Sequence, residues 1–248
     1  MSSDQLIYGL HAVVALLNNP HRNVKQVFVN QERQDKRMLD VLSQLAQRSI
    51  PVLLLSAAKM ALKFPEEVHQ GIVAIASPLP QYHEQDLMAF LEKKTSIPFL
   101  LILDGITDPH NLGACLRTAD AAGVDCVIIP KDKSAPITPV VSKVACGAAE
   151  SIPVIRVTNL ARTIETIKQG GIWVYGTAGE AQTSLYALDA KIPLALVLGA
   201  EGEGLRRLTR ERCDGLFSIP MLGSVSSLNV SVATGVCLFE VVRQRNVL

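Results

Sequence analysis

The feature that most constrains the fold is a series of short, almost continuously apolar segments in the second part of the chain. From Phe99 onward these segments read FLLILDG, CVIIP, IPVIRV, IWVYGTAG, LALVLGAE and LFSIP, and each has the length of one strand. Stretches with helical spacing separate them. Strands that are apolar on both faces and alternate with helices are typical of a mainly parallel sheet covered on both sides. The sequence therefore predicts an α/β fold whose ligand site lies beyond the carboxyl ends of the strands.

The first part of the chain shows a similar alternation on a smaller scale. Helix and strand patterns follow one another in GLHAVVALLNN, VKQVFVN, DKRMLDVLSQLAQRS, PVLLLS and GIVAIAS. Next, prolines and mixed charges surround one short helix in PLPQYHEQDLMAFLEKKTSIP, which is typical of a semi-rigid tether rather than of core. We therefore expect a small α/β domain over residues 1–77, a linker over 78–97 and the main domain over 98–248.

The charge balance and the hydropathy pattern exclude few classes of protein. The 248 residues include 24 Lys and Arg against 23 Asp and Glu, a net charge of +1 that does not by itself indicate a nucleic-acid-binding protein. Basic clusters such as LRRLTRER and VRQR are, taken singly, most often solvated helix faces. No apolar run approaches the roughly 20 residues needed to cross a bilayer, and the first residues do not resemble a secretory signal. We expect a cytoplasmic protein with no membrane segment.

The cysteines are scattered and do not form a metal or disulfide pattern. Cys115, Cys126, Cys146, Cys213 and Cys237 are odd in number and show no CxxC or Cys/His spacing. We interpret them as small hydrophobic residues in a reducing compartment and expect neither a metal nor a disulfide.

Polar residues gather where the first apolar strand of the main domain ends. In LDGITDPHNLGACLRTADAAG, Asn111 stands before a predicted helix and Arg117 lies nearly two turns inside it. An isolated pair of this kind is most often a helix cap and a surface arginine. The surrounding small residues favour a second interpretation, in which close packing leaves a cleft around one long cation.

A second such segment, LVLGAEGEGL, is rich in glycine and carries Gly199 and Glu201. Glycines permit positive φ and close approach of backbone to a ligand. The segment does not match the dinucleotide-binding GxGxxG pattern, which disfavours a nicotinamide enzyme, and the chain has no phosphate loop or GxSxG elbow.

The third segment, IPMLGSVSSLNVSVATG, places Ser224, Ser226, Ser227, Asn229 and Ser231 around the start of a helix. One such residue suffices as a cap, and the others compete with the helical backbone for hydrogen bonds. Helix-entrance amides suit a ligand that needs donors. The small residues of VATG favour close packing against a neighbour.

Taken together, NLGACLR, LVLGAEGEGL and IPMLGSVSSLNVSVATGVCLFE resemble, in order and spacing, the three signature motifs of the SpoU (TrmH-like) family of RNA ribose methyltransferases, members of the SPOUT class. The front end, from IYGLHAVVALLNN to VHQGIVAIA, is similar to the small ribosomal-protein-like RNA-binding domain of family members that methylate a guanosine of 23S ribosomal RNA. The resemblance implies a deep trefoil knot, S-adenosylmethionine as methyl donor, no metal, and a homodimer with its active site near the interface. It also implies a target in the peptidyl-transferase region and a role in ribosome biogenesis.

The resemblance also implies roles for individual residues. Those expected to act in catalysis are Asn111, Arg117, Glu201, Ser227 and Asn229; those expected to bind the cofactor are Thr177, Gly199, Ile219, Met221 and Leu228. A guanidinium keeps its proton at neutral pH. We therefore expect Arg117 to orient the phosphate and ribose and to stabilise developing alkoxide charge, with the proton acceptor left open.

Two other function classes stay open at this point. One is an RNA-binding protein that keeps the fold without turnover, and the other is a small-molecule or nicotinamide enzyme on the same α/β pattern. Among methyltransferases, a transfer RNA substrate is the nearest competitor to ribosomal RNA, which the front domain favours because proteins that bind folded RNA recognise its shape, its loops and its 2′-hydroxyls.

Overall fold

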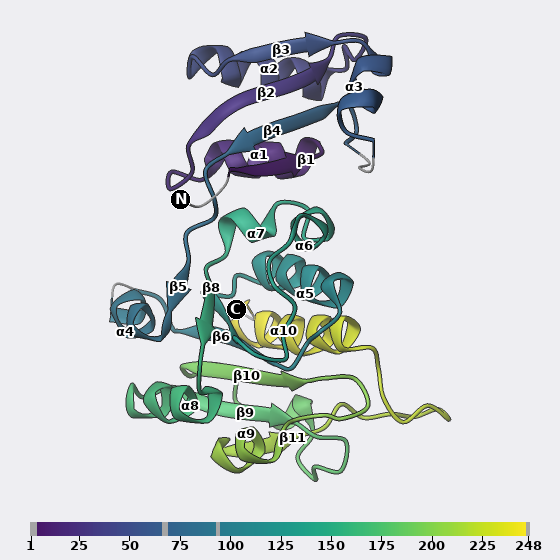
Figure 1. Cartoon of the computed structure of the whole chain (residues 1–248). Coiled ribbons are helices and arrows are strands. Elements are labelled where there is room, and N and C mark those ends of the chain that lie inside the picture. The colour runs from purple at the N-terminus through teal and green to yellow at the C-terminus, as the bar shows by residue number, and fades with distance from the viewer. Residues whose placement is uncertain (1–3, 66–68, 93–94, 247–248) are drawn as a thin grey trace. The chain divides into compact units, whose positions relative to one another are not determined.

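A computed structural model describes residues 4–65, 69–92 and 95–246 (Figure 1). By packing, the chain divides into two compact units. The N-terminal unit consists of Met1–Pro80 and Ile137–Ser151, and the C-terminal unit of Gln81–Pro136 and Ile152–Leu248. Residues 137–151 therefore pack with the N-terminal unit, although in the sequence they stand between two strands of the C-terminal sheet.

The N-terminal unit is built on a four-stranded sheet with the order β1-β4-β2-β3. Strand β4 runs antiparallel to β1 and β2, while β3 runs parallel to β2. The helix and strand patterns predicted for this region are all present, and β1 is an additional edge strand. Its elements are β1 (Gln5–Tyr8), α1 (Leu10–Asn18), β2 (Val24–Asn30), α2 (Lys36–Gln47), β3 (Val52–Leu55), α3 (Ala57–Lys63) and β4 (Ile72–Ala76).

Local chemistry explains where these helices begin and what they cover. The Asp35 side chain accepts a hydrogen bond from the Met38 amide and caps α2, and Ser56 caps α3 in the same way. The apolar faces of α1 and α2 bury Leu16 and Leu45 completely in one core with strands β2 and β4. The small unit therefore has its own hydrophobic core.

Two short helices, α6 (Pro139–Val144) and α7 (Ala148–Ser151), complete the N-terminal unit. The helical spacing of PVVSKVACGAAES predicts a single helix here, and that prediction is wrong because Cys146 and Gly147 adopt φ values of 51° and 97°. Gly147 lies against α1, where a Cβ atom would come within 2.6 Å of the Ala15 Cβ. The break lets the chain turn tightly against α1.

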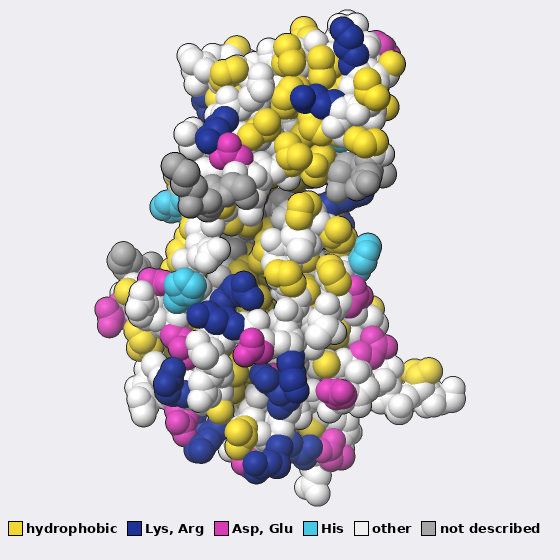
Figure 2. All heavy atoms as spheres, viewed as in Figure 1, with side chains coloured by type: hydrophobic (Ala, Val, Ile, Leu, Met, Phe, Trp, Pro, Cys, Tyr) yellow, Lys and Arg dark blue, Asp and Glu magenta, His cyan; other side chains and the backbone are white. Residues whose placement is uncertain are grey.

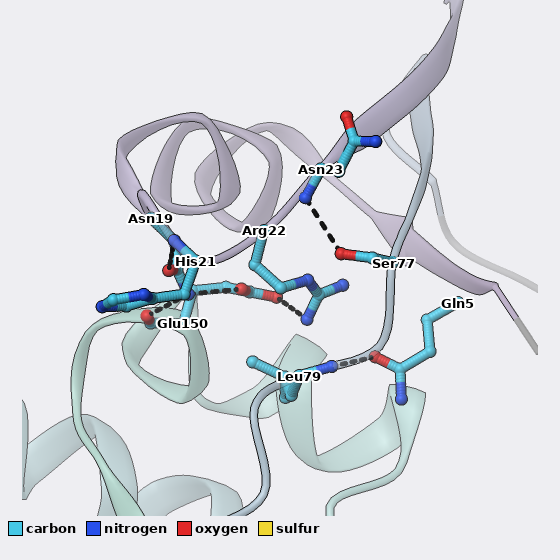
Figure 3. Close-up of polar contacts among 8 residues, drawn as sticks. All are labelled: Gln5, Asn19, His21, Arg22, Asn23, Ser77, Leu79 and Glu150. Atoms are coloured by element: carbon cyan, nitrogen blue, oxygen red, sulfur yellow. Dashed lines mark hydrogen bonds and ion pairs between the residues drawn. The ribbon is translucent and has the colours of Figure 1, made fainter. Parts of the chain in front are cut away.

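A buried polar cluster joins α7 to the end of α1 (Figure 3). Arg22 forms an ion pair of 3.1 Å with Glu150, and both side chains are almost fully buried. Asn19 donates from Nδ2 to the Glu150 carbonyl at 2.8 Å. Nearby, the Asn23 amide donates to the Ser77 hydroxyl at 2.9 Å, which ties β2 to the segment after β4.

The C-terminal unit has a seven-stranded sheet with the order β11-β9-β10-β6-β7-β8-β5, and every pair in it is parallel. The predicted parallel α/β fold is confirmed. The strands are β5 (Tyr82–His83), β6 (Phe99–Asp104), β7 (Cys126–Pro130), β8 (Val154–Val157), β9 (Trp173–Thr177), β10 (Leu194–Gly199) and β11 (Gly215–Phe217).

Helices cover both faces of this sheet (Figure 1). On one side α5 and α10 lie side by side, and on the other α8 packs beside α9. Leu87 of α4 is buried in the same core as β6 and α8, so this part of the segment between the units packs with the C-terminal sheet. The helices are α4 (Glu84–Glu92), α5 (Pro109–Ala121), α8 (Leu160–Gln169), α9 (Arg207–Arg212) and α10 (Val230–Asn246), with a 3₁₀ turn at Leu185–Ala187. Among the described residues no helix is both long and apolar enough to cross a membrane.

Candidate active site

The loop that follows β10 folds back on itself. Gly204 donates its amide to the Ala200 carbonyl at 2.9 Å, and both Gly202 and Gly204 have positive φ. A Cβ atom at Gly199 would overlap the backbone of Gly204. The close approach that the sequence predicts at this glycine is therefore made by the chain's own loop.

This loop forms one wall of a cavity of about 750 Å³ at the carboxyl ends of β9, β10 and β11. A cavity of this size suits a small molecule or cofactor. All five residues expected to bind the cofactor line it: Thr177, Gly199, Ile219, Met221 and Leu228. Glu201 and Ser227, which were expected to act in catalysis, line it as well.

Asn229 joins the three polar segments that the sequence analysis singled out. Its Nδ2 donates to Asn111 Oδ1 at 3.1 Å and to Glu201 Oε2 at 3.2 Å. Its Oδ1 accepts from the Ser231 amide at 2.9 Å, and its carbonyl accepts from the Ala233 amide. One side chain thus caps α10 and also links the start of α5 to the glycine loop.

Arg117 and Ser227 stand outside this hydrogen-bonded group. Arg117 is exposed on α5, and no acidic partner for it occurs in the described part of the chain. Ser227 is exposed at the cavity wall. Of the five residues expected to act in catalysis, the structure therefore brings three into direct contact.

The serine-rich segment precedes the last helix instead of forming its first turn. The sequence predicts a helix from Ser226, but α10 begins at Val230. The difference has a physical reason, because Asn229 already satisfies the helix end and the serines before it favour irregular backbone. Ser224, Ser226 and Ser227 are exposed in a loop that projects from the unit, and Leu222 in that loop is fully exposed.

The small residues of α5 and α10 serve the packing of the two helices. Cys115 Sγ lies 3.4 Å from Thr234 Oγ1, and both side chains are buried. Gly235 faces Thr118. The predicted close packing of VATG against a neighbour is thus met by α5.

The basic cluster around α9 is neutralised by acidic side chains. Arg207, Arg210 and Arg212 form ion pairs with Glu211, Glu180 and Glu165, respectively. The Glu180 carboxyl accepts a bond from its own backbone amide and one from Arg210, and both lower its pKa. On the face drawn in Figure 2, basic and acidic side chains likewise alternate over the C-terminal unit. This cluster is a solvated helix face, as its composition suggests.

The cysteines near the core have thiols that resist ionisation. Burial raises the pKa of the Cys115 thiol to about 11. Burial is also the main cause that raises the pKa values of the Cys213 and Cys237 thiols to about 12. A protonated thiol is a poor nucleophile and a poor metal ligand. In the described ranges, no three His, Cys, Asp or Glu side chains come together as a metal site would require.

Sequence reasoning gave no role to Asp104 and Arg206, which meet at the base of the glycine loop. Asp104 is fully buried at the end of β6 and accepts from the Arg206 amide at 3.0 Å and from Arg206 Nε at 2.5 Å. The available signal was a carboxylate ending an otherwise apolar strand.

Comparison with known proteins gives the same family for both parts of the chain. The model of the "SpoU rRNA Methylase family" matches residues 98–239, and the model for "RNA 2'-O ribose methyltransferase substrate binding" matches residues 6–82. The chain is 56% identical to the 23S rRNA (guanosine-2'-O-)-methyltransferase RlmB of Pseudomonas putida over 247 residues, covering 100% of this chain and 99% of that protein. It is also 56% identical to RlmB of Escherichia coli strain K12 over 242 residues, covering 98% of this chain and 99% of that protein.

A solved structure supports the same grouping. The AdoMet-bound rRNA methyltransferase from Sinorhizobium meliloti superposes with a TM-score of 0.78 at 25% identity, covering 99% of this chain and 88% of that one. The similarity thus extends over both units of the chain.

Proposed function

The chain belongs to the SpoU rRNA methylase family, and from this premise we propose that it methylates the ribose 2′-hydroxyl of a guanosine in 23S ribosomal RNA, with S-adenosylmethionine as the methyl donor. The observation that carries the proposal is the Asn229 network, which adjoins the cavity and includes one residue from each of the three motifs. A target in the peptidyl-transferase region and a role in ribosome biogenesis are part of the same proposal.

The cavity fits a molecule with the mixed chemistry of S-adenosylmethionine. Apolar side chains of Leu198, Ile219 and Leu228 line it together with the exposed backbone of the glycine loop. Apolar walls suit an adenine ring, and free backbone amides and carbonyls suit its polar edge and the ribose. We assign cofactor binding to Thr177, Gly199, Ile219, Met221 and Leu228.

The reaction is an in-line displacement. The ribose oxygen forms a bond to the methyl carbon, the bond from that carbon to sulfur breaks with its electron pair going to sulfur, and the hydroxyl proton leaves. A sulfonium methyl is already electrophilic, so the protein's task is to position the two reactants and stabilise the charge that develops on oxygen.

The catalytic roles that we assign follow from the network and from side-chain charge. Asn111, Glu201 and Asn229 hold the loop and the helix starts in place beside the ribose, and Ser227 contributes a hydroxyl at the cavity wall. Arg117 stays protonated and orients the target phosphate and ribose while stabilising alkoxide charge. Because Arg117 has no acidic partner among the described residues, its charge is free for a phosphate.

The quaternary structure, the location and the domain roles complete the proposal. Val232 and Phe239 on α10 are 52% and 48% exposed, and an apolar outer face on this helix supports a homodimer. The catalytic domain over 98–248 forms the trefoil knot expected of the SPOUT class, and within these bounds residues 137–151 pack with the N-terminal unit. The domain over 1–77 binds RNA. Residues 78–97 connect the two, with β5 and α4 packed on the C-terminal sheet, and the protein acts in the cytoplasm.

The test is transfer of labelled methyl from S-adenosylmethionine to unmethylated 23S ribosomal RNA, with transfer RNA in parallel and the modified ribose mapped. Label on one guanosine ribose of the ribosomal RNA, lost in Arg117→Ala, is the expected result. Label on transfer RNA alone would replace the proposed substrate. Cofactor binding without transfer to either RNA would instead indicate a binding protein.

A further inference from the structure

The ion pair between Asp104 and Arg206 is unlike the other ion pairs around α9. The Asp104 side chain is 0% exposed, whereas those of Glu211, Glu180 and Glu165 are exposed by 50%, 63% and 45%. Exposed pairs contribute little to stability because water competes for both charges. A buried carboxylate, in contrast, must keep its partners or remain as an unpaired charge in the interior.

Asp104 uses both of its oxygens on one residue. Oδ2 accepts from the Arg206 backbone amide at 3.0 Å, and Oδ1 accepts from Arg206 Nε at 2.5 Å. The same Oδ1 lies 2.5 Å from a terminal nitrogen of the guanidinium, as an ion pair. The carboxylate therefore fixes the backbone of Arg206 as well as its side chain. Arg206 is the residue at which the glycine loop ends and α9 begins.

The other end of the same loop is also attached to Asp104. Strands β6 and β10 pair in parallel, and Gly199 stands opposite Asp104 in the register. The loop thus leaves the sheet beside Asp104 and returns to the Asp104 carboxylate, with the Gly204–Ala200 hydrogen bond across its middle. Both ends of the loop are fixed at one point of the sheet.

This loop carries the groups on which the site depends. It lines the cavity from Gly199 to Leu205, and Glu201 within it bonds to Asn229. A shift of the loop by a fraction of an ångström would alter the cavity wall and the Asn229 network together. Small misplacements of positioned groups have large effects on transfer reactions.

We propose that Asp104 and Arg206 are positioning residues for methyl transfer, which hold the glycine loop in the conformation that binds the methyl donor. This inference rests on the proposed function. It adds two residues to the catalytic and cofactor-binding residues that were assigned from the family resemblance. Neither residue contacts the reacting atoms; both act through the loop.

The test compares Arg206→Ala and Arg206→Lys with Arg207→Ala in the full-length protein. Arg207 is adjacent in sequence and forms an exposed pair with Glu211, so its loss controls for removing one positive charge from the start of α9. Three quantities are measured: the dissociation constant for S-adenosylmethionine by calorimetry, hydrogen exchange of residues 200–205, and the melting temperature.

Arg206→Ala is expected to weaken binding of S-adenosylmethionine by roughly tenfold or more and to accelerate exchange in the loop. Arg206→Lys restores part of both, because it keeps a charge near Asp104 but not the two-nitrogen contact. Arg207→Ala leaves binding and exchange at wild-type values.

A contrary result would be an Arg206→Ala protein that melts at a lower temperature and yet keeps wild-type affinity and wild-type loop exchange at low temperature. That result would overturn the proposal, because the pair would then have a structural role only. If the wild-type protein fails to bind S-adenosylmethionine, the proposed function is wrong, and loop exchange alone then decides whether the pair fixes the loop.

Discussion

Each unit of the molecule has a long-range ion pair with a buried carboxylate, and the two pairs are built differently. Arg22 and Glu150 are 128 residues apart, and Asp104 and Arg206 are 102 apart. In the first pair both side chains are buried, and Nε and one terminal nitrogen of Arg22 have no hydrogen-bond partner among the described residues. In the second, the carboxylate is fully satisfied while the arginine is 39% exposed.

The two ion pairs have different roles. Burial lowers the pKa of Arg22 and raises the pKa of Glu150, so desolvation outweighs the attraction between the two charges. A pair of this kind adds little net stability but is costly to break, and it fixes where α7 docks on α1. The Asp104 pair fixes a loop at a ligand site. Substitutions in the Arg22–Glu150 pair should therefore change stability, and substitutions in the Asp104–Arg206 pair should change cofactor binding.

The largest expected effect is that of Glu150→Ala. It leaves the Arg22 guanidinium buried without its carboxylate acceptor and removes the side-chain contact with Asn19, which should lower the free energy of unfolding by about 3 to 5 kcal/mol. Chemical denaturation monitored by circular dichroism measures this. Glu150→Gln is the matched control: its amide oxygen can still accept from Arg22 although the negative charge is gone, so it should cost less than Glu150→Ala. Weaker binding of S-adenosylmethionine in folded Glu150→Ala would break the comparison.

Next in size is Gly199→Ala in the C-terminal unit. The added methyl overlaps the backbone of Gly204, so the loop must move, at a cost of about 1 to 3 kcal/mol. We expect affinity for S-adenosylmethionine to fall much further than this loss of stability suggests, because the loop forms the cavity wall. Gly223→Ala, in a segment with open space around the glycine, serves as the control. Wild-type affinity in Gly199→Ala would contradict the assignment of this wall.

Asn229→Ala should cost about 1 kcal/mol through loss of the helix cap and should abolish methyl transfer. Asn229→Asp separates the two roles, because it keeps a capping oxygen but cannot donate to Asn111 and Glu201. For Asn229→Asp we expect a retained helix cap with strongly reduced transfer, and some loss of stability because its carboxylate stands beside Glu201. Full activity in this variant would show that the amide donor is dispensable.

The smallest effect is on the pH dependence of stability. Because the folded-state pKa of Glu150 is raised above its ordinary value, the folded state binds this proton more tightly than the unfolded state does. The stability that this proton contributes is complete below the ordinary glutamate pKa and is lost as pH rises through the folded value. The unfolding free energy of the wild type should therefore fall, relative to Glu150→Gln, over that range. An opposite slope in paired denaturation curves would mean that attraction to Arg22 dominates.

The sequence predicted the parts of the fold and site that follow from local pattern. Apolar runs predicted the parallel sheet, because a strand buried on both faces has few polar residues. Polar residues after such strands predicted the region of the cavity, because carboxyl ends of parallel strands meet at one edge. The family resemblance added the residues that line the cavity, and their roles stay predictions.

What the sequence did not predict depends on contacts between distant residues. Nothing near Asp104 indicates a partner 102 residues away, and Glu150 looks like any helix-surface acid until Arg22 is placed beside it. The break at Cys146 and Gly147 interrupts a good helical pattern because α1 requires the chain to turn there. The sequence also did not predict where α10 begins. Several serines and one asparagine precede this helix, and each of them is a suitable N-cap residue.

The packing of residues 137–151 with the N-terminal unit has a consequence for how this molecule can be divided and recombined. A gene fragment that stops at residue 80 encodes the four-stranded sheet without α6 and α7, and it leaves Arg22 with no acid to meet. A chimera that exchanges the N-terminal unit between relatives must exchange two separate stretches of the gene together. Unless it does so, a relative without an acid at the position of Glu150 would leave Arg22 buried with no partner, even when both parents are stable.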